Sequence, residues 1–226
     1  MNLKEHYSKL YSESINNISS NKYEIDKLID SKFDQRFGIT LLVRPSNEVK
    51  DKIQRLLSEL KAVEPNQYYY PNSDIHITIM SIISCYESFD IDNIELPKYI
   101  ELIKKCLAQN QNIEIQFKGL TASNSCIMLQ GFMNNNLLND IRNKLRVEFK
   151  NSELEQSLDK RYSIQTAHST IVRFRKQLNQ KDEFLKIVDK YVDHDFGTFD
   201  IKKIELVHND WYQRNEFVKK LHEFEI

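Results

Sequence analysis

The sequence is poor in the residues on which several common functional sites depend. It contains only four glycines, and none stands in a Gly-Lys-Ser or Gly-Lys-Thr triplet, so a P-loop nucleotide site is excluded. Metal-ligand spacing is also missing among its three cysteines, Cys85, Cys106 and Cys126. An odd number of cysteines without such spacing indicates buried, reduced thiols, as in cytoplasmic proteins.

Long apolar runs and an excess of positive charge are missing as well. No stretch of about 18 apolar residues occurs, as a membrane-spanning helix needs, and the first residues lack the apolar segment of a signal peptide. The net charge of −1 argues against a basic surface that coats long nucleic acids, although a local basic cleft stays compatible with it. We therefore expect a cytoplasmic monomer with no membrane or long-DNA partner.

What the sequence does contain is a repeated histidine motif. His-Ile-Thr-Ile at residues 76–79 and His-Ser-Thr-Ile at residues 168–171 stand 92 residues apart, and each histidine follows a tyrosine (Tyr70 or Tyr162) by six residues. The other four histidines have no threonine two places on. Each motif lies in an apolar run that predicts a buried strand, where residues i and i+2 share a face. Each would aim one imidazole and one hydroxyl into the same space.

Two imidazoles and two hydroxyls in one cleft suit phosphodiester chemistry without a metal. An imidazole has an ordinary pKa near 6.5, so His76 and His168 can serve as general acid and general base. Thr78 and Thr170 can donate hydrogen bonds to phosphate oxygens. The structural alternative is a pair of half-buried histidines on strands. A zinc site is disfavoured because no carboxylate or third histidine accompanies either motif at ligand spacing, and we expect no cofactor.

The predicted elements form a duplicated pattern. Apolar periodicity predicts strands at 37–43, 75–85, 113–117, 125–132, 164–175, 199–207 and 216–226, and helices at 47–62, 96–110, 137–149 and 180–191. The order strand, helix, motif strand, helix, strand therefore occurs twice. It predicts one α+β domain over 35–226, with lobe repeats at about 37–119 and 125–226 and the site between them. Residues 1–34 are expected to form a helical extension of two helices, broken near residues 16–21, without chemistry of its own.

The two motifs resemble those of the 2H phosphoesterase superfamily, which includes the 2′-5′ RNA ligase-like (LigT-like) proteins and the cyclic phosphodiesterases. The resemblance covers about Phe37 to Ile226 and leaves the first 34 residues outside. It implies a duplicated two-lobed fold with a pseudo-twofold cleft, antiparallel sheets flanked by helices, and cleavage of 2′,3′-cyclic or 2′-5′ phosphodiesters. It also implies that His168 activates water, that His76 protonates the leaving group, and that Arg173, five residues after the second histidine, binds phosphate.

Several side chains near the motifs have more than one interpretation. Arg173 lies at an odd offset from His168, so a regular strand points it away from the cleft, whereas a bulge re-aims it. Tyr70 and Tyr162 are candidates for stacking on a base, and Tyr70 is equally interpretable as packing at a loop edge. Trp211 and Tyr212 are interpreted as packing residues.

These observations predict a hydrolase of a 2′,3′-cyclic phosphate or 2′-5′ phosphodiester in a nucleotide or short RNA. One alternative is a hydrolase of a cyclic oligonucleotide signal, in which the tyrosine loop holds a second base. Another, from a different class, is a nucleotide- or RNA-binding module with little or no turnover. Retention of both histidines and both threonines argues against a pure binder.

Overall fold

The structure, a computed structural model, describes residues 2–107, 112–160 and 163–226. Its strands are β1 (Arg36–Val43), β2 (Tyr68–Tyr69), β3 (Ile77–Glu87), β4 (Ile113–Ser123), β5 (Cys126–Met133), β6 (Ser169–Arg173), β7 (Asp195–Ile201), β8 (Lys203–Asp210) and β9 (Lys219–Glu225). Its helices are α1 (Leu3–Ser19), α2 (Asn47–Val63), α3 (Leu96–Cys106), α4 (Leu137–Lys150) and α5 (Lys181–Lys190), with a short 3₁₀ turn at Ile91–Asn93. No helix in these ranges is long and apolar enough to span a membrane.

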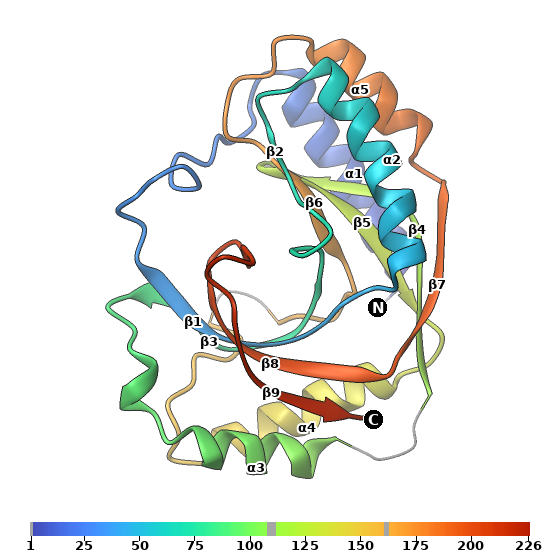
Figure 1. Cartoon of the computed structure of the whole chain (residues 1–226). Coiled ribbons are helices and arrows are strands. Elements are labelled where there is room, and N and C mark those ends of the chain that lie inside the picture. Colours follow the sequence, from blue (N-terminus) through green and yellow to red (C-terminus); the bar gives the residue numbers. More distant parts are fainter. Residues whose placement is uncertain (1, 108–111, 161–162) are drawn as a thin grey trace.

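Two antiparallel sheets form the body of the molecule. The first has the strand order β3-β1-β8-β9 and the second β2-β6-β5-β4-β7. Helices α3 and α4 lie on the outer side of the first sheet, and α1, α2 and α5 lie on the outer side of the second (Figure 1). This arrangement leaves the inner faces of the two sheets turned toward each other, and it confirms the predicted α+β class.

The helices predicted after residue 34 begin within one residue of the expected positions. Ser46 caps α2, because its side chain accepts a hydrogen bond from the backbone N–H of Val49. The apolar face of α2 is buried through Val49, Ile53, Leu56, Leu57 and Leu60. The prediction of a helix over 96–110 is wrong at its end: α3 stops at Cys106, and the backbone of Leu107 is already extended, while residues 108–111 lie outside the described ranges.

The predicted element order occurs twice, but each sheet combines strands from both repeats. Strand β4 closes the first repeat yet pairs with β5 in the second sheet. Strand β8 comes from the second repeat yet pairs with β1 in the first sheet. The helices also pack on strands of the other repeat: α2 of the first repeat lies against β6 and β7, and α4 of the second repeat lies against β3. The repeats 37–119 and 125–226 therefore do not coincide with the two halves of the molecule in space.

Four strand predictions need correction. The strand expected at 113–117 extends to Ser123 in β4, and the one expected at 216–226 begins at Lys219 in β9. The expected strand 199–207 is divided between β7 and β8, because the chain passes from the second sheet to the first at Lys202. The expected strand 164–175 is shorter and begins at Ser169. The preceding backbone is not paired as a strand here, because arginines of α4 bind its carbonyl groups at Ile164 and Thr166.

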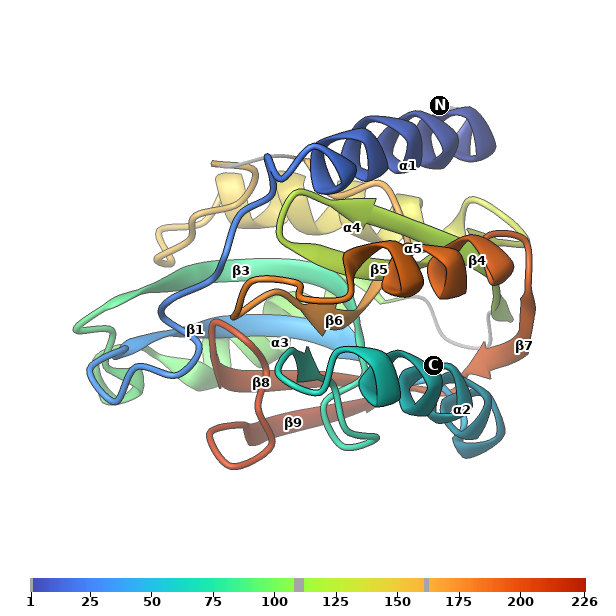
Figure 2. The same ribbon diagram turned by 90° about the horizontal axis from the view of Figure 1, so that it is seen from above.

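The N-terminal region also differs from the prediction, because it contains a single helix. Helix α1 packs on β4, and residues 20–35, here called the strap, run from α1 to β1 along one side of the molecule without a second helix (Figure 2). Side chains of the strap compete with helical hydrogen bonding: Asp26 accepts from the backbone of Leu28, and Ser31 accepts from the backbone of Phe33. Ile29 of the strap is buried.

A buried arginine of α4 connects the two motifs. Arg142 is completely buried and has no carboxylate partner among the described residues. Its guanidinium instead donates to three backbone carbonyls, those of Thr78, Ile79 and Thr166, at 2.9–3.0 Å. Because a guanidinium presents several donors in one plane, a single side chain joins β3 to the segment that leads into β6. We call this set of contacts the Arg142 clamp.

Removing the clamp is expected to destabilise the protein strongly. Arg142→Met leaves three buried carbonyls without donors, and we expect a loss of roughly 2–4 kcal/mol in the free energy of unfolding. Arg146→Met is the matched control one turn later on α4, where the arginine forms a partly exposed pair with Asp159, and it should cost clearly less. Urea denaturation of both variants checks this, and equal losses would contradict it.

Candidate active site

Both histidine motifs line one cavity of about 250 Å³ between the sheets. His76 and Thr78 reach it from the start of β3, and His168 and Thr170 reach it from the start of β6. Each histidine stands one residue before its strand begins. The structure therefore brings together the four side chains that the sequence grouped, although they come from opposite sheets.

A β-bulge follows each motif threonine at the same position of the motif. In β3 the partners of Leu41 and Leu42 are Met80 and Thr78, so Ile79 is the extra residue. In β6 the partners of Ile127 and Met128 are Val172 and Thr170, so Ile171 is the extra residue. A bulge changes the alternation of side chains by one residue. Arg173 therefore shares the cavity face with Thr170, as the bulge interpretation predicts.

Backbone contacts determine which ring nitrogen of His76 carries the proton. Its Nδ1 lies 2.7 Å from the carbonyl oxygen of Asp74. A carbonyl oxygen can only accept, so Nδ1 carries a hydrogen and Nε2 has the free lone pair in the neutral ring. Asp74 is itself held, since its carboxylate accepts hydrogen bonds from Tyr68 and from the backbone of Asn215.

His168 is oriented by a chain of hydroxyl groups. Its Nδ1 lies 2.7 Å from Oγ1 of Thr166, whose side chain also hydrogen-bonds Tyr7 of α1. The Tyr7 hydroxyl donates to the carbonyl oxygen of Gly131 at 3.2 Å, so Thr166 donates to Tyr7 and accepts from Nδ1. Nε2 of His168 therefore also has a free lone pair. Burial raises the pKa of Tyr7 to about 12, so it keeps its proton at neutral pH.

Both imidazoles are neutral in the free protein. Burial lowers the pKa of His76 from 6.5 to about 4, and the positive charge of Arg44 adds to this effect. Burial also lowers the pKa of His168 to about 4, with further contributions from the charges of Arg142 and His76. Both imidazoles line the same cavity. At neutral pH each can accept a proton, and an anion bound between them favours the protonated form.

The remaining predicted residues take different positions. Arg173 lines the cavity beside the Tyr212 ring. Burial lowers the pKa of Arg173, but its interactions with Tyr70, Cys126 and Asp26 together outweigh that effect, so the pKa is raised. Tyr70 also lines the cavity but is only 2% exposed, and its hydroxyl bonds Arg173. Almost none of the Tyr70 ring surface is accessible to a base, so in this structure Tyr70 contacts Arg173 and is not placed for stacking.

The other aromatic candidates are placed differently. Tyr162 lies outside the described residues. Trp211 and Tyr212, interpreted from sequence as packing residues, line the cavity.

Sequence reasoning missed the residues that support the motifs. Arg142 was detectable, because it follows Leu138 by four residues on the apolar face of a predicted helix. Tyr7 and Asp26 carried no such signal, since their partners are more than 100 residues away. In the described ranges no group of three or more His, Cys, Asp or Glu side chains is placed to hold a metal ion.

The low histidine pKa values predict an acid-sensitive fold. Unfolded histidines titrate near 6.5, so between that pH and about 4 the unfolded chain binds protons that the folded protein does not. The histidine contribution to the free energy of unfolding is therefore complete above pH 6.5 and is lost as the pH falls toward 4. Urea denaturation across this range should show a flatter pH dependence for His76→Gln/His168→Gln than for the parent. Parallel curves for the two proteins would contradict the prediction.

Comparison with known proteins gives a family and a fold. Residues 16–226 match the model of the AKAP7 2′5′ RNA ligase-like domain. The fold is similar to that of TT0787 of Thermus thermophilus, with a TM-score of 0.57 and 14% identity over 83% of this chain and 96% of that one. It is also similar to E. coli LigT in its complex with 3′-AMP, with a TM-score of 0.58 and 12% identity over 85% of this chain and 98% of that one. A search of curated proteins finds no significant match.

The extent of the family match corrects one expectation. It begins at residue 16, inside α1, so it includes the strap that the sequence resemblance left outside the family core. The structural neighbours, at such low identity, support the fold alone, whereas the family supports phosphodiesterase-type activity in general. The chain belongs to the AKAP7 2′5′ RNA ligase-like domain family, within the 2H phosphoesterase superfamily.

Proposed function

We propose that the protein is a metal-independent phosphodiesterase that hydrolyses a 2′,3′-cyclic phosphate or a 2′-5′ phosphodiester of a nucleotide or short RNA. The observation that carries this proposal is the pair of imidazoles in one cavity. Both have Nδ1 engaged behind them and Nε2 available, and a threonine and Arg173 stand on the same face. The E. coli LigT structure holds 3′-AMP, a nucleotide of the product class, and this supports the choice of ligand.

In the proposed reaction, water attacks phosphorus in line and a ribose oxygen leaves. Nε2 of His168 accepts a proton from the water, while the protonated Nε2 of His76 gives a proton to the departing oxygen. His76 is neutral in the free protein, so the negative charge of the bound diester supplies the attraction that raises its pKa and protonates it. Thr78, Thr170 and Arg173 donate to the non-bridging oxygens, where charge is concentrated in the transition state.

The two motifs are not equivalent around the pseudo-twofold axis, and this bears on the assignment of acid and base. The residue five places after His76 is Ser81, whereas the residue five places after His168 is Arg173, and both line the cavity. Of these two equivalent positions, only the one after the second motif carries a cation. This asymmetry favours one orientation of the substrate, and with it one division of labour between the histidines.

The test is product analysis of 2′,3′-cyclic AMP incubated with the protein in EDTA. We expect turnover by the parent, a loss of roughly 10³- to 10⁴-fold in His76→Ala or His168→Ala, and a loss of roughly 10- to 10²-fold in Thr78→Val or Thr170→Val. His194→Ala, an exposed histidine away from the cavity, is the control and should keep parent activity.

The product formed and the activities of the variants together distinguish the proposed hydrolase from a nucleotide-binding module. Formation of a 2′- or 3′-phosphate identifies which ribose oxygen leaves and so orients the acid and the base. Parent-level turnover in both histidine variants would overturn the mechanism. Nucleotide binding without any turnover, also with 2′-5′-linked and cyclic oligonucleotides, would favour the binding module instead.

A further inference from the structure

The charge that faces the proposed phosphate position is paired with a carboxylate from the strap. Nη1 of Arg173 lies 3.5 Å from Oδ2 of Asp26, and both side chains are largely buried. Among the described residues that line the cavity, Arg173 and Lys160 are the basic ones. Lys160 is exposed, whereas Arg173 follows the bulge of the second motif strand. Asp26 therefore acts on the buried cation nearest to the motif.

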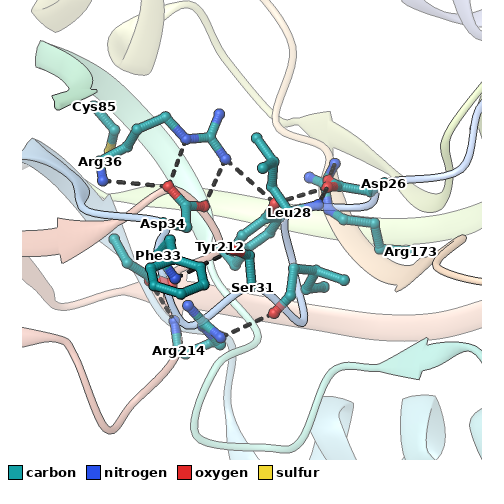
Figure 3. A network of polar contacts seen from close by, with 12 residues as sticks. Asp26, Leu28, Ser31, Phe33, Asp34, Arg36, Cys85, Arg173, Tyr212 and Arg214 are labelled. Carbon is teal, nitrogen blue, oxygen red and sulfur yellow. Dashed lines mark hydrogen bonds and ion pairs between the residues drawn. The ribbon is translucent and has the colours of Figure 1, made fainter.

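Asp26 is held firmly in this position. Its backbone N–H donates to the carbonyl of Phe174, the residue after Arg173, at 2.7 Å. Its Oδ1 accepts from the Tyr212 hydroxyl at 2.8 Å and from the backbone of Leu28 at 3.1 Å. Figure 3 shows Asp26 beside Arg173, with dashed contacts joining it to the surrounding network. These hydrogen bonds hold the Asp26 carboxylate at a fixed position beside Arg173.

A fixed carboxylate beside the anion-binding arginine discriminates by ligand charge. A phosphodiester carries one negative charge, whereas a phosphomonoester carries about −1.5 to −2 at pH 7. The extra charge of the monoester is repelled by a carboxylate at this position, and the effect is large in a partly buried site because screening is weak there. The diester substrate carries less charge and loses less affinity.

We propose that Asp26 is a specificity-determining residue, which holds Arg173 in place and limits the net positive charge so that the site retains phosphodiesters and releases phosphomonoester products. This inference rests on the proposed function. It gives the strap an indirect part in ligand selection, through a residue that lies outside both histidine motifs. Asp26 acts through Arg173 and through its charge, and it touches no reacting atom.

The test compares two nucleotides that differ in charge. Binding of 2′,3′-cyclic AMP, a monoanion, and of 3′-AMP, a dianion at about pH 8, is measured by titration calorimetry in EDTA. All proteins carry His168→Ala so that the cyclic nucleotide is not consumed. The measured quantity is the affinity for 3′-AMP divided by the affinity for 2′,3′-cyclic AMP. If a variant only loosens Arg173, the binding of both nucleotides becomes weaker. If a variant removes the repelling charge, the affinity ratio rises.

Asp26→Asn keeps the acceptor for Tyr212 but removes the charge, and we expect the ratio to rise roughly three- to tenfold. Asp26→Ser offers a second neutral variant should the first fail to fold. Asp26→Glu, which keeps the charge, should restore the parent ratio. Asp30→Asn is the matched control, because Asp30 is also a strap aspartate paired with an arginine, Arg175, but neither lines the cavity.

The possible outcomes separate this inference from the proposed function. Binding of both nucleotides with a ratio unchanged in the neutral Asp26 variants, or an equal rise in Asp30→Asn, would overturn the inference alone. Failure of the His168→Ala parent to bind either nucleotide would overturn the proposed nucleotide site and the inference with it. A rise confined to the neutral Asp26 variants would support both.

Discussion

The arrangement of the site depends on the buried guanidinium of Arg142. It has no carboxylate partner among the described residues and is satisfied by the carbonyls of Thr78, Ile79 and Thr166. One of these, Ile79, is the bulged residue of the first motif strand, whose backbone is freed from regular pairing. The arginine thus satisfies a group that the bulge leaves unpaired, and it fixes the spacing of the two histidine-bearing segments. Its charge also contributes to keeping His168 neutral.

The two bulges make a duplicated site, and the residues beyond them make it asymmetric. Both shift the alternation of side chains after the motif threonine, so that the fifth residue after each histidine faces the cavity. On one side that residue is Ser81 and on the other it is Arg173. Carboxylates of the strap then pair with arginines of the body, as in Asp26 with Arg173 and Asp34 with Arg36. Both pairs are largely buried, where solvent screens charge only weakly, so they fix charge and position near the cavity.

Supporting contacts also reach the site from the N-terminal helix. Tyr7 of α1 bonds Gly131 and Thr166, and Thr166 holds Nδ1 of His168. The pattern is the one by which many imidazoles are oriented, with one ring nitrogen held from behind and the other turned toward the ligand. The region expected to lack chemistry of its own therefore supports one histidine through Tyr7 and contacts Arg173 through Asp26.

The sequence by itself determined the two histidines and two threonines that line the cavity, together with most of the order of the elements. Histidine and threonine two residues apart, repeated in apolar runs, indicated both the chemistry and the duplication, because these signals depend only on local spacing and residue type. Tertiary structure alone decided that the repeats exchange strands between sheets, that β7 and β8 separate at Lys202, and that Asp26 meets Arg173. It also decided the bulge that places Arg173 in the cavity. The physical reason is the same in each case: these features are set by hydrogen bonds and ion pairs between residues far apart in the chain, and no local periodicity encodes such partners.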